Sequence, residues 1–162
     1  VVERVIHATA DVSFAHTMIV ADDAVGAGVA AMRAGAPVVA DVTMTAAGIT
    51  GRPTTCLLPE ARPGPGGQPT RSAMAVRAAA ERHPDGAVFA IGCAPTALIE
   101  LLRLSDEGRL RPALVVGVPV GFVGAAEAKD ALRQSGLPAI TNRGERGAAA
   151  SRPRAFTTAA AP

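Results

Sequence analysis

The residues that could perform chemistry are few, and they form no familiar catalytic or metal-binding pattern. Three histidines occur, His7, His16 and His83, and their separations match no metal-ligand spacing. Cys56 and Cys93 also match no metal motif, and no Ser-His-Asp or Cys-His order stands out. An imidazole titrates near neutral pH, so proton transfer by a histidine is the chemistry that these residues leave open.

His7 lies between apolar residues in the segment RVIHA, whereas His16 has no partner motif. His83 precedes Pro84 and is expected to end a helix. A single histidine among apolar residues is more often structural than catalytic. The residues alone therefore leave two roles open for His7, packing and proton transfer.

Arginine supplies a second kind of chemistry. All of the 16 basic residues except Lys129 are arginines, and the formal net charge is +2. An Ala- and Arg-rich genomic composition accounts for most of them. Arg71 stands out because TRS at residues 70–72 places it in the first turn of a predicted helix, where it opposes the helix dipole and gains from a bound anion. Simple surface exposure is the alternative.

Composition excludes several classes of protein. Hydrophobic residues make up 49% of the 162 residues and charged residues 19%, which indicates a folded domain with a core. Four Phe, no Trp and no Tyr argue against modules that stack nucleic-acid bases. No apolar run is long enough to span a bilayer and no signal peptide is present. We expect a cytoplasmic protein with no nucleic-acid or membrane partner and no structural disulfide.

The elements that must position these residues alternate between short β-branched strands and amphipathic helices, which is typical of a parallel α/β sheet. Strands are expected at 38–41, 54–58, 87–92, 113–117 and 138–141. Helices are expected from Asp22 or Asp23 to Ala34, over 43–48, from a Thr70 cap to His83, from Pro95 to near Gly108, and from Ala125 to Gln134. The pattern predicts a three-layer αβα sandwich with an open, mainly parallel, five-stranded sheet.

The expected organisation is one domain over residues 1–150, followed by a tail at 151–162 that we expect to be poorly ordered. Pro153 lies where a last helix would otherwise run. The chain begins at Val1, within a segment that is itself expected to be folded. We therefore expect a further N-terminal segment in the natural protein.

Ligands of open α/β sheets bind beyond the carboxyl ends of the strands. Those ends carry residues 41–44, 92–96 (GCAPT) and 117–124 (GVPVGFVG), which are rich in Gly, Pro and small side chains. Helix N-termini follow all three and favour anionic groups. A ligand with several carboxylates would suit this edge, while tight turns are the alternative explanation of the glycines. The glycine segment fits neither nucleotide-binding fingerprint.

Five segments together resemble the precorrin-8X methylmutase (precorrin isomerase) family of cobalamin biosynthesis. They occur in the family's order and at compatible spacing, from Val1 to about Gly147. They are RVIHA at 4–8, AGAPVVADVTMTAAGI at 34–49, TRSAMA at 70–75, AIGCAPTAL at 90–98 and GVPVGFVGAAEAKDAL at 117–132.

The resemblance implies a flavodoxin-like αβα fold, a homodimer and an isomerisation that uses no cofactor and no metal. A methyl group would migrate from carbon 11 to carbon 12 of the corrin ring, turning precorrin-8X into hydrogenobyrinate; a cobalt-containing equivalent is the other possible substrate. The histidine of the family's R-x-I-H-A motif falls on His7, which would protonate the macrocycle.

The resemblance also implies a set of substrate-binding residues. Arg71 would pair with peripheral carboxylates, and the two strand-end loops would line the ring pocket. The full implied set is Thr70, Arg71, Ser72, Cys93, Thr96, Gly121, Phe122, Val123 and Gly124. The sequence departs from the family's usual pattern at Cys93, where Asn is usual, at Ala128, where Ser is usual, and at residues 143–150 (RGERGAAA), where a glycine-rich segment is reduced.

Two alternatives of other classes remain at this point. One is a non-catalytic protein that binds corrinoids or other tetrapyrroles. The other is an unrelated flavodoxin-like protein that binds a nucleotide or phosphate.

Overall fold

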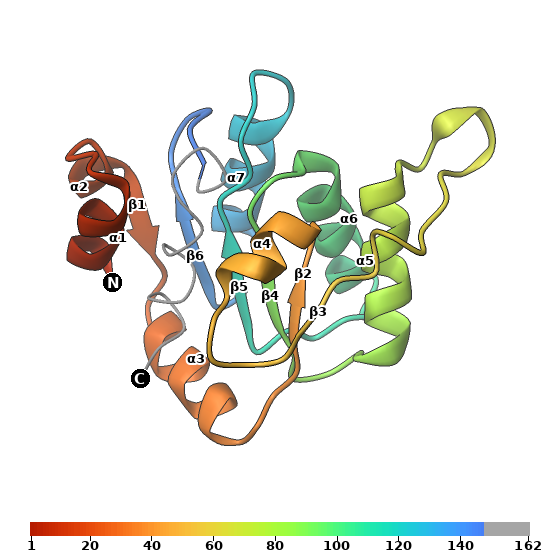
Figure 1. Ribbon diagram of the computed structural model, residues 1–162, viewed down its shortest axis with the longest axis horizontal. Coiled ribbons are helices and arrows are strands. Elements are labelled where there is room, and N and C mark those ends of the chain that lie inside the picture. Colours follow the sequence, from red (N-terminus) through yellow and green to blue (C-terminus); the bar gives the residue numbers. More distant parts are fainter. Residues whose placement is uncertain (148–162) are drawn as a thin grey trace.

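The chain alternates strands and helices from Met18 onward. A computed structural model describes residues 1–147 of the chain (Figure 1). The helices are α1 (Val2–Thr9), α2 (Phe14–Thr17), α3 (Ala24–Arg33), α4 (Thr43–Gly48), α5 (Arg71–Arg82), α6 (Pro95–Asp106) and α7 (Ala125–Gln134), with a 3₁₀ turn η1 (Pro65–Gly67). The strands are β1 (Met18–Val20), β2 (Val38–Ala40), β3 (Thr54–Thr55), β4 (Val88–Ile91), β5 (Leu114–Gly117) and β6 (Ala139–Asn142).

The sheet has the strand order β1-β6-β5-β4-β2-β3. All neighbours run parallel except β1, which pairs antiparallel with β6 and places Ile19 opposite Thr141. The expected number of five strands is therefore wrong by one within the described residues. An antiparallel edge strand on an otherwise parallel sheet is common. β1 is not predicted because its three residues, although apolar, form only a short, half-buried segment at the edge of the sheet.

The predicted three layers are confirmed by the two hydrophobic clusters, which lie on opposite faces of the sheet. Alternate residues of β4 serve the two faces, because successive side chains of a strand point in opposite directions. Phe89 and Ile91 belong to the cluster that contains residues of α5, α6 and α7. Val88 and Ala90 belong to the cluster that contains residues of α3. β4 is thus buried along its whole length, as its uninterrupted apolar sequence predicts.

Local signals place most helix ends correctly. Thr70 caps α5 as predicted, since its hydroxyl oxygen accepts from the Ala73 amide at 3.3 Å. Pro95 lies in the first turn of α6, and Gly35 takes the left-handed conformation after α3. Asp23 does occupy the N-cap position of α3, but its own backbone is left-handed and its side chain caps nothing.

The other differences are at the edges of the chain and of the sheet. The strand expected at 54–58 is reduced to β3, because its ladder with β2 stops after Thr55. Among the described residues, no helix is both long and apolar enough to cross a membrane. The predicted domain boundary at 150 and the tail at 151–162 lie outside the described residues.

Candidate functional site

The three strand ends singled out from the sequence do meet at one edge of the sheet. β2, β4 and β5 are direct neighbours in the order β2-β4-β5 and all run in the same direction. The loop at 118–124, called here the glycine loop, follows β5 and hydrogen bonds back to the β4 side. The amides of Val118 and Val120 donate to the carbonyls of Ile91 at 2.9 Å and Cys93 at 3.4 Å.

Asp41 holds the GCAPT loop in place. Asp41 follows directly after β2 and is only 1% exposed. One carboxylate oxygen accepts from the Gly92 amide at 3.1 Å, and the other accepts from the amides of Cys93 and Ala94, both at 2.8 Å. Three charge-assisted hydrogen bonds to consecutive amides fix the backbone that leads into α6.

This arrangement corrects one expectation about anion binding. The helix N-terminus after the GCAPT loop is expected to favour an anionic group, but the amides of Gly92, Cys93 and Ala94 just before α6 already donate to Asp41. A carboxylate on a ligand would also be repelled by the Asp41 charge at this point. Binding of an anionic ligand must therefore depend on groups outside these three amides.

Cys93, whose amide donates to Asp41, is half-buried. Burial, with a smaller contribution from the Asp41 charge, raises the pKa of the Cys93 thiol. A thiol with a raised pKa is protonated at neutral pH and is a poor nucleophile. Cys93 can therefore contribute packing or a weak hydrogen bond to a site here.

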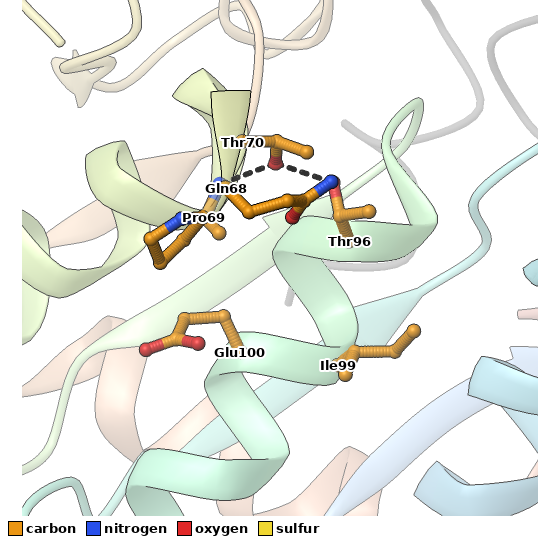
Figure 2. A pocket seen from close by; sticks show the side chains of 7 residues that line it. Gln68, Pro69, Thr70, Thr96, Ile99 and Glu100 are labelled. Atoms are coloured by element: carbon orange, nitrogen blue, oxygen red, sulfur yellow. Dashed lines mark hydrogen bonds between the residues drawn. The ribbon is translucent and has the colours of Figure 1, made fainter. Parts of the chain in front are cut away.

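Thr70 and Thr96 come together at the adjacent N-termini of α5 and α6. Their hydroxyl oxygens lie 2.8 Å apart in a hydrogen bond. Both residues line a cavity with a volume of about 380 Å³, and Figure 2 shows their side chains close to each other. The cavity is lined by Gln68, Pro69, Thr70, Ala73, Thr96, Ile99 and Glu100. The structure thus brings together two of the predicted binding residues that lie 26 positions apart in the chain.

Glu100 contributes a buried carboxylate to this cavity, but its charge is fully paired. Arg77 Nε donates to Oε1 at 2.5 Å, and Arg103 Nη2 donates to the same oxygen at 2.7 Å. Burial alone would raise the pKa of Glu100, but the hydrogen bonds from Arg103 and Arg77 outweigh it and hold the pKa below its ordinary value. Glu100 is therefore ionised at neutral pH and joins α5 to α6.

Arg71 begins α5 as predicted, and its side chain is exposed. Arg71 Nη2 donates to the carbonyl oxygen of Leu58 at 2.9 Å, which directs the guanidinium toward the segment after β3. A guanidinium has five N–H donors, so this contact leaves capacity for a carboxylate. Ser72, the next residue, is half-buried.

The glycine loop presents an apolar tip. Phe122 and Val123 are each 89% exposed, between Gly121 at φ +140° and Gly124 at φ +77°. A Cβ atom at Gly121 would meet no other atom, and one at Gly124 would meet Pro95 at an ordinary 3.8 Å. The positive φ angles alone thus require glycine here. A valine at either position would strain the loop whether or not a ligand is bound.

His7 lies on α1, and its side chain is exposed. The apolar neighbours of His7 in the sequence do not enclose it within the chain, because α1 buries Val5 and leaves His7 exposed. Figure 1 shows α1 beyond β1 at one edge of the sheet, while α5 lies toward the opposite edge. The structure therefore does not bring His7 to the Thr70–Thr96 cavity within one chain.

Three structurally important residues were not identified from the sequence. Asp41 was noted only as a strand end, and Lys129 and Asn142 received no role. Lys129 is fully buried and donates to Asn142 Oδ1 at 3.3 Å and to the Arg146 carbonyl at 2.6 Å. Its signal in the sequence is that it is the single lysine, on a helix whose apolar residues predict a buried face. Within residues 1–147, no cluster of His, Cys, Asp and Glu could hold a metal ion.

The fold and the site together define the class: an αβα protein with an open, mainly parallel sheet and a candidate ligand site at the carboxyl ends of its strands. The family model of precorrin-8X methylmutase matches residues 1–156. The chain therefore belongs to the precorrin-8X methylmutase family, whose members are isomerases, as the sequence resemblance predicts.

Individual relatives agree with this assignment. A cobalt-precorrin-8 methylmutase of Priestia megaterium is 41% identical over 160 residues, which cover 91% of this chain and 69% of that protein. A precorrin-8X methylmutase of Pseudomonas aeruginosa is 42% identical over 158 residues, which cover 91% of this chain and 76% of that protein. The crystal structure of a precorrin-8X methylmutase from Thermus thermophilus superposes with a TM-score of 0.84 at 36% identity, covering 98% of this chain and 82% of that one.

Proposed function

We propose that this protein catalyses the methylmutase step on a corrinoid, moving a methyl group from carbon 11 to carbon 12 of precorrin-8X or of its cobalt-containing equivalent. The observation that carries the proposal is the family match over residues 1–156. The GCAPT loop and the glycine loop, which carry the family resemblance, lie side by side at the ligand-binding edge of the sheet. The reaction joins no second substrate, so one macrocycle must fill the site.

The macrocycle would lie across the strand-end loops. The cavity beside Thr70 and Thr96 is at the small end of the range of about 300–1,000 Å³ for drug-sized ligands. A corrin with its carboxylate side chains is larger, so the cavity would receive one edge of it. Phe122 and Val123, exposed at the tip of the glycine loop, would cover apolar ring surface. Cys93 and Ser72 would add short contacts near the rim.

Arg71 would bind peripheral carboxylates of the ligand. Asp41 occupies the amides of the GCAPT loop, which leaves Arg71 as the predicted binding residue that carries a positive charge. Charge-assisted pairing of a guanidinium with carboxylates is strong and directional. This assignment makes corrinoid affinity sensitive to salt and to the loss of Arg71.

His7 would serve as the proton donor. A sigmatropic methyl shift needs no nucleophile, but protonation of the conjugated ring changes its electron demand. General acid catalysis of this kind contributes about 10² to 10⁴ in rate. Because His7 is exposed and remote from the cavity within one chain, we propose that the protein acts as a homodimer whose second copy changes the surroundings of α1.

One measurement tests the oligomeric part of this proposal. Light scattering on the purified protein is expected to give the mass of a dimer, and the mass of a single chain would contradict it. We place the enzyme in the cytoplasm, which agrees with the free thiols of Cys56 and Cys93.

The decisive experiment incubates the purified protein with precorrin-8X and, separately, with cobalt-precorrin-8. The expected result is an absorption change to the corrin chromophore with one of these substrates, at a rate proportional to enzyme concentration. Tight binding of hydrogenobyrinate without conversion of either substrate would overturn the proposal in favour of a corrinoid-binding protein. Failure to bind hydrogenobyrinate at all would show that the site does not bind a corrinoid.

A further inference from the structure

Lys129 on α7 is fully buried, which is rare for a lysine. Its Nζ donates to Asn142 Oδ1 at 3.3 Å and to the Arg146 carbonyl at 2.6 Å, and both acceptors are neutral. Removing an ammonium group from water is expensive, and an apolar residue of similar size is often as stable or more stable. Burial lowers the pKa of Lys129 to about 8, against the opposing effects of Asp130 on the same helix and Glu145.

Lys129 and Asn142 together hold the chain that follows β6, residues 143–147, called here the bridging segment. Asn142 Nδ2 donates to the carbonyl of Arg143 at 3.2 Å and to that of Arg146 at 2.8 Å. The Arg146 carbonyl thus accepts from two buried side chains at once. This carbonyl is the point at which α7 and β6 both fix the bridging segment.

One side of the bridging segment contacts the corner that carries α1. Arg146 Nη1 pairs with Asp11 at 2.6 Å and donates to Ser13 Oγ at 3.0 Å, just after the helix that bears His7. The Arg143 amide donates to the Thr17 carbonyl at 2.9 Å, next to β1. These contacts join sequence positions more than 120 residues apart.

The other side contacts the glycine loop. The amide of Gly121 donates to the carbonyl of Glu145 at 3.2 Å. Gly147 packs so closely under the start of the loop that a Cβ atom would lie 2.4 Å from the Val118 carbonyl oxygen and 2.6 Å from that of Pro119. The bridging segment therefore connects the loop predicted to cover the macrocycle with the corner that carries the predicted proton donor.

We propose that Lys129 is a positioning residue, which fixes the bridging segment through the Arg146 carbonyl and thereby sets the glycine loop and the α1 corner in the places that the corrinoid reaction needs. This inference rests on the proposed function. The hydrogen bonds of Lys129 end on Asn142 and on the Arg146 carbonyl, so it would act through the backbone of the bridging segment. A misplacement of the order of 1 Å costs about 10² in rate when it affects groups that must be aligned.

The test compares Lys129→Met with a matched control, Arg133→Met. Arg133 lies on the same helix, and its cation makes one ion pair, with Asp130 at 2.6 Å. We expect Lys129→Met to fold and to melt no lower than the wild type, while its kcat/KM falls on the order of tenfold to a hundredfold. Hydrogen exchange at residues 118–124 should become faster in Lys129→Met alone, whereas Arg133→Met should match the wild type in both measurements.

The control measurements separate the possible failures. Hydrogen exchange needs no substrate, so unchanged exchange at 118–124 in a folded Lys129→Met protein overturns the inference even if the wild type is inactive. An inactive wild type with faster exchange in Lys129→Met contradicts the proposed function and leaves the positioning role supported. If Lys129→Met does not fold, Gly147→Ala displaces the bridging segment with the lysine intact, and unchanged loop exchange and kcat/KM in that variant would overturn the inference.

Discussion

The two halves of the candidate site are held by buried charges of opposite sign. At the centre of the sheet, Asp41 accepts three hydrogen bonds from consecutive amides of the GCAPT loop. At the β6 edge, Lys129 donates two hydrogen bonds, to Asn142 and to one carbonyl of the bridging segment. The carboxylate is fully satisfied by the backbone it holds, whereas the ammonium loses so much hydration that its pKa falls to about 8.

This difference indicates that the two halves of the site have different roles. The Asp41 side carries Cys93 and Thr96 on backbone that is fixed by short, charge-assisted bonds. The Lys129 side carries the exposed glycine loop and the α1 corner, which depend on a few polar contacts near the surface. We therefore expect changes near Asp41 to affect the stability of the fold, and changes on the Lys129 side to affect catalysis more than stability.

The largest expected effect tests the catalytic side of this comparison. His7→Asn should lower kcat by about 10² to 10⁴, because asparagine cannot donate a proton as an imidazolium does. The affinity for hydrogenobyrinate and the melting temperature should stay close to those of the wild type, since His7 is exposed within the chain. Steady-state kinetics and product titration check this. His16→Asn, a change of another exposed histidine, is the control. Turnover of His7→Asn near the wild-type rate would make His7 a surface residue without a catalytic role.

The second effect tests the structural side. Asp41→Ala removes the acceptor of three amides in a buried setting and should lower the free energy of unfolding by about 3 kcal/mol or more. Asp41→Asn keeps one carbonyl oxygen and should give an intermediate loss. Urea unfolding measures both, with Asp85→Ala as a control that breaks only an exposed ion pair with Arg111. A loss for Asp41→Ala no greater than that for Asp85→Ala would show that the GCAPT loop holds its conformation unaided.

Sequence patterns predicted the elements whose signals are local. The ends of α4 and α7 match the expected 43–48 and Ala125–Gln134, because Gly and Ser-Gly signals stop each helix at its own position. β1 was missed because its strand conformation depends on pairing with β6, and the paired residues lie 120 to 124 positions apart in the chain. A three-residue segment carries too little periodicity to reveal such a partner.

The candidate site was predictable in the same partial way. The strand-end rule correctly brought residues 41–44, 92–96 and 117–124 to one edge of the sheet. It did not reveal that Asp41 would use the amides of the GCAPT loop, nor that Arg71 would contact the Leu58 carbonyl. Those pairings depend on tertiary distances that residue types do not encode. The role of His7 stays a prediction from family resemblance.

A third, smaller effect concerns ligand binding beside the Asp41-held loop. Arg71→Ala should weaken hydrogenobyrinate binding about tenfold, the loss expected for one charge-assisted contact at a solvent-exposed position. The melting temperature should change little, because the hydrogen bond from Arg71 to the Leu58 carbonyl is at an exposed position. Isothermal titration at low and high salt measures the effect. Arg62→Ala, which removes an exposed arginine that likewise hydrogen bonds loop carbonyls, is the control. Equal affinity of Arg71→Ala and wild type would show that Arg71 only stabilises the segment after β3 through its hydrogen bond to Leu58.

The smallest effect concerns the pH dependence of stability on the Lys129 side. Burial places the pKa of Lys129 near 8 in the folded protein, against 10.5 for an ordinary lysine. Below pH 8 the ammonium is charged in both folded and unfolded chains, so the cost of burying it is present in full. Between pH 8 and about 10.5 the folded chain has lost this proton and the unfolded chain still binds it, so the free energy of unfolding rises with pH.

Measured against Lys129→Met, the wild type should therefore gain roughly 1 kcal/mol of stability between pH 7 and pH 9. Lys129 is the single lysine of the chain, so no other lysine contributes to the pH dependence of the difference between the two proteins. The Cys93 thiol also titrates at high pH, but it is present in both proteins and cancels in the difference. If the positioning role is correct, corrinoid affinity of the wild type should fall over the same range in which stability rises, because a neutral amine holds the Arg146 carbonyl less tightly. Urea unfolding curves that run parallel for the two proteins from pH 7 to pH 9 would show that the buried nitrogen keeps its proton up to pH 9, so that burial does not lower its pKa to about 8.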